Sequence, residues 1–119
     1  MFREILSELI NRSEGGIAAV VMGMDGIAVE TCLHEGASLE AEQLGLELSL
    51  VLKEAQRASE LLNAGVPKEL TIEGTKFTAI LRLINPDYFV ALALKPEANQ
   101  GKARYLLRVG ALKLAQALE

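Results

Sequence analysis

The sequence has few of the residue types on which catalytic sites and disulfide-stabilised secreted proteins usually depend. Its 119 residues include one cysteine, Cys32, one histidine, His34, and no tryptophan. A lone thiol cannot close an internal disulfide, which excludes a disulfide-stapled secreted scaffold. One His and one Cys are too few for a zinc site. No nucleophile–base pair or shared carboxylate pocket is indicated either. We therefore expect no catalytic residue, metal or cofactor, with His34 on the surface and Cys32 a small core or edge residue.

Net charge and hydropathy further limit the classes of protein to which this chain can belong. Lys and Arg number 12 against 16 Asp and Glu, a formal net charge of -4, which argues against nucleic-acid binding. No apolar run approaches the roughly 20 residues of a membrane helix. Arg3, Glu4 and Glu8 interrupt any signal-peptide core. We expect a cytoplasmic protein without membrane insertion, folded as a single domain over residues 1–119.

Apolar spacing and turn residues predict three helices and five strands. Phe2 to Ile10 shows a helical stripe that stops at Gly15-Gly16. Two short strands around an Asp-Gly turn predict a hairpin. A long helix capped by Ser38 is expected to run to about Leu62. The remaining ranges are Ile17–Met22 and Ile27–Cys32 for the hairpin, then strands Glu69–Glu73, Lys76–Ile84 and Tyr88–Lys95, and a final helix Gly101–Leu118.

The long helix carries more apolar surface than one sheet face can cover. At roughly 100° per residue, one stripe fits its own sheet. Its members are Leu44, Leu48, Val51, Leu52, Ala55, Ala58 and Leu62. A second group, Leu39, Leu46, Leu50 and Leu61, lies on another side, interleaved with Lys53 and Arg57. Burying a leucine contributes about 1.5–3 kcal/mol, so this group needs a cover.

Two covers are possible, the first or last helix of the same chain or the same helix of a second copy. We favour a two-fold homodimer. The short alternating strand Glu69–Glu73, with Leu70 and Ile72, is expected at a sheet edge, where it is free to pair with its symmetry mate. The predicted dimer interface therefore consists of Leu39, Leu46, Leu50, Lys53, Arg57, Leu61, Leu70 and Ile72.

The final helix is the other candidate contact surface. Its core stripe includes Ala103, Leu107 and Leu114, while Tyr105, Val109 and Leu112 point elsewhere beside two arginines. Tyr and Arg are frequent anchors of protein contacts. Ordinary packing against the first helix is the alternative. The possible partner contacts are Arg104, Tyr105, Arg108 and Leu112. Arg82, alone in an apolar strand, is compatible with a partner contact or an edge position.

Several stretches in this order resemble the Roadblock dynein light chain family (Roadblock/LC7 domain), bacterial MglB-like branch. They are Gly15-Gly16, MGMDGIAVE (Met22 to Glu30), ELTIEG (Glu69 to Gly74) and NQGKARYLLR (Asn99 to Arg108). The resemblance covers essentially the whole chain. It implies an α+β sandwich in αββαβββα order, with a five-stranded antiparallel sheet, one long helix on one face and two helices on the other.

The resemblance also implies a function. Family members dimerise through the long helix and third strand into a ten-stranded sheet, and serve as platforms for small Ras-like GTPases. MglB-type proteins stimulate GTP hydrolysis by MglA-type GTPases without an inserted arginine finger. This chain lacks the C-terminal extension of typical MglB proteins, so GTPase binding is the firmer expectation and activation the weaker one. The alternative is a small-molecule-sensing or signalling adaptor domain, which requires an internal cavity.

Overall fold

Eight elements form in the order helix, two strands, helix, three strands, helix. The computed structural model describes residues 1–119. The elements are α1 (Phe2–Arg12), β1 (Gly16–Gly23), β2 (Ala28–Leu33), α2 (Ala41–Leu61), β3 (Glu69–Glu73), β4 (Thr78–Asn85), β5 (Tyr88–Leu94) and α3 (Gln100–Ala117). This order confirms the αββαβββα prediction. The order was predictable because the hydrophobic period of the sequence changes between helix-like and strand-like at the boundaries of these elements.

The five strands form one antiparallel sheet in the order β2-β1-β5-β4-β3. β5 lies at its centre, between β1, with Val20 opposite Ala91, and β4, with Ile80 opposite Leu92. β3 pairs only with β4, so it is an edge strand as predicted. Its second side offers unpaired backbone N–H and C=O groups.

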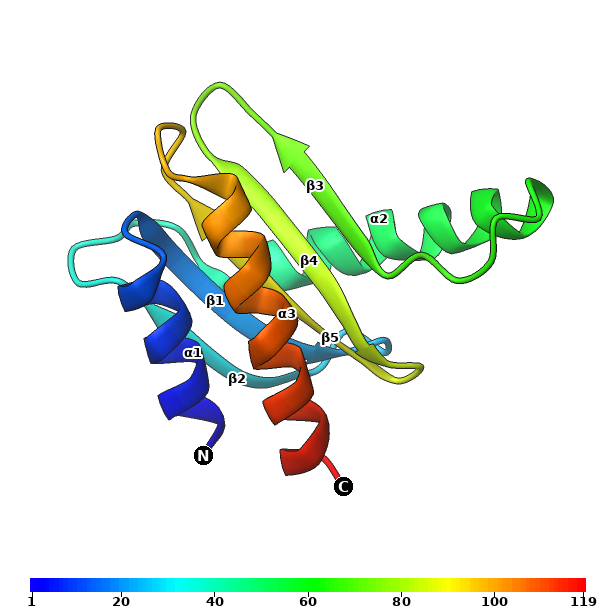
Figure 1. The fold of residues 1–119 in the computed structure, drawn as a ribbon, viewed down its shortest axis with the longest axis horizontal. Coiled ribbons are helices and arrows are strands. Elements are labelled where there is room, and N and C mark those ends of the chain that lie inside the picture. Colours follow the sequence, from blue (N-terminus) through cyan, green and yellow to red (C-terminus); the bar gives the residue numbers. More distant parts are fainter.

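Helices cover both faces of the sheet (Figure 1). α1 and α3 lie side by side on one face, and α2 lies on the other. Alternate strand residues therefore enter two different cores. Val21 and Leu92 pack against α1 and α3, whereas Val20 and Phe89 pack on the α2 side. The central strands are apolar on both sides because each side has a helix layer over it.

Two helix ends differ from the sequence prediction. Ser38 is not the N-cap of α2; Glu40 takes that position in an extended conformation, without a side-chain cap bond. Leu39 packs against the core beneath α2, which keeps this segment extended for longer than the capping pattern suggested. At the end of α1, two successive residues have positive φ, Glu14 at 55° and Gly15 at 150°.

Candidate functional site

Beyond Leu52, α2 has no buried residue; Ala55, Gln56, Ala58 and Ser59 are half-buried, and the other side chains are exposed. All fully buried α2 residues lie at or before Leu52, because only that part crosses the sheet. Figure 1 shows the rest of α2 extending past the sheet before the chain returns to β3. Most helical stability in proteins comes from packing of an apolar face. The last turns of α2 therefore lack the support that the first turns have.

Most of the predicted surplus leucines are exposed. Leu46, Leu50 and Leu61 are 41%, 61% and 71% exposed, whereas Leu39 is half-buried on its own core. Lys53 and Arg57 are exposed beside them. α1 and α3 lie on the opposite face of the sheet, so neither covers this group. The own-chain alternative considered from the sequence is thereby excluded for these three leucines.

Two residues assigned to the sheet-facing stripe do not lie there. Leu62 is 76% exposed and Val51 is also exposed, so the prediction that they face their own sheet is wrong. A helical wheel gives direction but not where the sheet ends, and Leu62 lies beyond it. Val51 is one turn after Glu47, which lines a hollow between α2 and β3, so Val51 lies on the side of α2 towards β3.

The apolar surface continues from α2 to the edge strand. The hollow between them is lined mainly by apolar side chains, including Leu44, Leu48, Ile72 and Phe77. Ile72 is exposed and Leu70 is half-buried, each paired on one side only with β4. The hollow connects α2 with β3, and we group the exposed apolar residues of these two elements under the name α2–β3 surface: Leu46, Leu50, Val51, Leu61, Leu62 and Ile72.

Charges interrupt this apolar surface without forming a catalytic arrangement. Arg57 donates from Nε to Glu54 Oε1 at 2.8 Å, and this hydrogen bond with the nearby negative charge raises the pKa of Arg57. No three His, Cys, Asp or Glu side chains gather closely enough to hold a metal ion. None of the helices is long and apolar enough to cross a membrane.

The structure separates the roles of the four residues singled out on α3. Tyr105 and Leu112 are 60% and 67% exposed, and Arg108 is exposed on the same outer side of the helix. Arg104 instead holds α3 to β3, donating from Nη2 and Nε to Glu69 Oε2 at 3.0 and 3.2 Å. Arg82 lies opposite Glu69 in the register and also faces its carboxylate, at 3.8 Å.

A groove between α1 and α3 was not expected from the sequence. Ile5, Leu9 and Val109 contribute to its apolar floor, with Tyr105 and Lys113 at its rim. The groove arises where two helices that are distant in the sequence pack side by side, so only the apolar margin of each helix could have indicated it. Val109 therefore packs towards α1, as the alternative interpretation of this helix proposed.

The whole chain is similar to several solved structures of other proteins. No family model and no curated protein matches the chain. Among solved structures, the chain is similar to MglC from Myxococcus xanthus, with 38% identity, 98% of each chain covered and a TM-score of 0.70. It is also similar to a Roadblock/LC7 domain from Streptomyces avermitilis, with 16% identity, 97% of this chain and 95% of that chain covered, and a TM-score of 0.87.

MglB from Myxococcus xanthus has the same fold at 8% identity, covering 98% of this chain and 94% of that chain with a TM-score of 0.88. At such identities the last two structures report on the fold alone. The similarity to MglC is high enough, over nearly all of both chains, to report on descent as well.

Proposed function

The chain belongs to the Roadblock/LC7 family, and on that premise we propose that it is a non-enzymatic homodimeric module that binds a small Ras-like GTPase of the MglA type. The observation that carries the proposal is the open α2–β3 surface, where exposed leucines of α2 adjoin an unpaired strand edge. In this proposal the chain contributes a shaped surface and no reacting group.

The extent of exposed apolar side chain on α2 supports the homodimer. Leu50, Leu61 and Leu62 are all more than half exposed, on a helix that has no buried residue beyond Leu52. Single exposed apolar residues are common, but several of them on one helix beside an unpaired strand edge are typical of an interaction site. A second copy of α2 would cover it through the same residues, as two-fold symmetry requires.

The unpaired edge of β3 supports the same arrangement. Joining β3 to β3 of a second copy would extend the five-stranded sheet of each protomer across the two-fold axis. Leu46 lies one turn before Leu50 and Lys53 nearly one turn after it, so both belong to the same side of α2 and to the proposed interface. The centre of the proposed interface is therefore the α2–β3 surface, with Leu39 and Leu70 partly occupied by packing within their own protomer.

Sedimentation equilibrium at micromolar protein concentration tests the dimer. We expect the mass of two chains for the natural protein and of one chain for the Leu61→Glu variant, because a buried unpaired carboxylate opposes association. Leu112→Glu is the matched control, since Leu112 is an equally exposed leucine on α3. A monomeric natural protein, or equal effects of the two substitutions, would contradict the proposed interface.

GTP turnover tests the partner. Purified MglA-type GTPases from the same organism would be measured for binding and for GTP hydrolysis, with and without this protein. We expect binding that Leu61→Glu weakens together with dimerisation, and any stimulation of hydrolysis to be lost with it. If none of these GTPases binds the dimer, the GTPase part of the proposal fails while the dimer itself stands.

A further inference from the structure

α3 is the one cationic helix of an acidic protein. It contains Lys102, Arg104, Arg108 and Lys113 and no acidic residue, whereas the whole chain has a net charge of -4. Its outer side also exposes Tyr105 and Leu112. An arginine beside an exposed aromatic residue is a common composition for protein contact sites. This surface is on the opposite face of the sheet from α2 (Figure 1).

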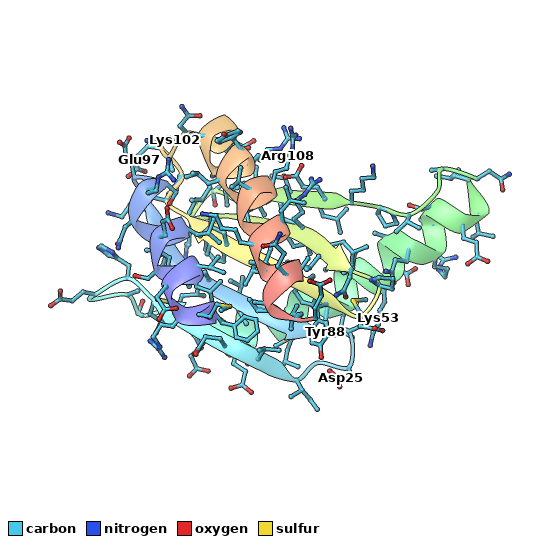
Figure 2. The ribbon with its side chains drawn as sticks, turned by 60° about the horizontal axis from the view of Figure 1, so that its bottom comes forward. Asp25, Lys53, Tyr88, Glu97, Lys102 and Arg108 are labelled. Carbon is cyan, nitrogen blue, oxygen red and sulfur yellow. The ribbon has the colours of Figure 1, made fainter.

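The ion pairs around α3 leave an excess of positive charge. Arg108 makes no salt bridge, and Figure 2 shows it projecting from α3. Glu69 is shared by two arginines, Arg82 and Arg104. Glu8 is likewise shared by Arg12 at 3.1 Å and Lys113 at 4.0 Å. About one uncompensated positive charge therefore remains on each of three groups: Arg108 alone, the two arginines around Glu69, and the two cations around Glu8.

The groove between α1 and α3 adds an apolar component beside these charges. Ile5, Leu9, Leu106 and Val109 line it, and Tyr105 forms part of its rim. Its volume is about 80 Å³, well below the 300–1,000 Å³ of sites for cofactors or small ligands. A space of this size accepts one aliphatic side chain. The space is too small for a nucleotide, so we take a side chain of a protein segment as its occupant.

We propose that the outer face of α3 and the α1–α3 groove form a second docking surface, which binds an acidic amphipathic helix of a partner protein. An aliphatic side chain of that helix enters the groove, and its carboxylates face Arg108 and Lys113. A third helix laid along two neighbouring helices uses the helix-in-groove mode of recognition. The surface belongs to one protomer, so it requires neither the dimer nor the GTPase.

A designed peptide provides the probe for this surface. It is an 18-residue capped helix with Leu along one side and Glu on both flanks; its counterpart has Lys in place of every Glu. Titration of the full-length ¹⁵N-labelled protein would follow amide shifts, and calorimetry would give the affinity. We expect saturable binding of the acidic peptide only, with shifts centred on Tyr105, Val109 and Lys113.

Two substitutions within the proposed surface and one outside it test whether the peptide binds there. Arg108→Glu should weaken binding about tenfold or more and Tyr105→Ala about threefold or more, as for contact anchors. Neither substitution removes a fully buried side chain or a salt bridge, so both variants should fold. Lys76→Glu is the matched control, because it reverses another exposed cation outside this surface and should leave binding unchanged.

Three outcomes of the peptide titration would contradict the proposal. Equal binding of the Lys counterpart, shifts centred on α2 and β3, or an acidic-peptide affinity insensitive to Arg108→Glu would overturn the proposal. Vesicles of phosphatidylserine and phosphatidylcholine form a separate arm. Vesicle binding that Arg108→Glu abolishes, with no binding of the acidic peptide, would assign the surface to membranes and would also overturn it.

Discussion

Gly16 begins β1 directly beneath the last turn of α1. A Cβ atom at this position would lie 2.7 Å from both the Cα and the carbonyl oxygen of Ile10, and as close to Ser13 Oγ. Ile10 is buried, and Ser13 donates its hydroxyl to the Ile10 carbonyl at 3.0 Å. The backbone of α1 would have to move before any side chain fitted here, since backbone atoms cannot change rotamer.

Substitution of this glycine tests the close approach. We expect Gly16→Ala to lower the free energy of unfolding by about 2–3 kcal/mol, as overpacking of a core does. Gly36→Ala is the control: Gly36 has a φ of 83° but open space around it, so only the backbone cost of about 1 kcal/mol applies. Urea denaturation would measure both. Equal losses would show that backbone conformation, and not the contact with α1, explains Gly16.

The glycine pair shows what local sequence can and cannot predict. Gly15-Gly16 correctly indicated the end of the first helix, because glycine is common there. Positive φ falls on Glu14 as well as on Gly15, and the requirement at Gly16 comes from α1 packing onto β1. Such a close approach depends on how α1 packs on β1 in the folded protein, and this packing cannot be inferred from the residues next to Gly16 in the sequence.

At the scale of elements, Glu69 connects α3 to the edge strand. Its side chain is largely buried, and Arg104 supplies two of its hydrogen bonds from the neighbouring helix. Its second carboxylate oxygen, Oε1, is buried without a partner. The carboxylate therefore depends on Arg104, because Arg82 is more distant at 3.8 Å. This connection fixes the position of α3 over β3 and β4.

Removal of the arginine should therefore cost more than removal of an ordinary surface ion pair. We expect Arg104→Ala to lower the free energy of unfolding by about 1–2 kcal/mol, since Glu69 would keep its burial and lose its donors. Arg12→Ala, which removes an exposed pair within α1, should cost at most about 0.5 kcal/mol. Thermal or urea unfolding of the two variants would make the comparison. An equal, small cost for both would show that Glu69 is well solvated.

The periodicity of α2 was predictable, but its relation to the sheet was not. Leu44, Leu48 and Leu52 face the core as expected from a helical wheel. Leu62 does not, because it lies beyond the sheet, and Val51 does not, because it lies on the side of α2 towards β3. Periodicity assigns residues to sides of a helix; the width of the neighbouring sheet decides how many of them are covered.

At the scale of the whole molecule, stability should depend on protein concentration. If pairing through α2 and β3 completes the fold, unfolding and dissociation are coupled. We expect a hundredfold increase in concentration to raise Tm by about 5 °C for a dimer of this size. The Leu61→Glu variant should show no such dependence. Scanning calorimetry at two concentrations would measure the shift, and a constant Tm for the natural protein would contradict coupled folding.

The sandwich architecture has one more consequence for the proposed assembly. α2 and the α1–α3 layer lie on opposite faces of the sheet, so pairing through one face leaves the other free. Two-fold symmetry would then place two identical acceptor grooves on one molecule. A partner carrying two acidic helices on a linker of suitable length would be retained by avidity, gaining about 10²–10⁴ in apparent affinity from weak individual contacts.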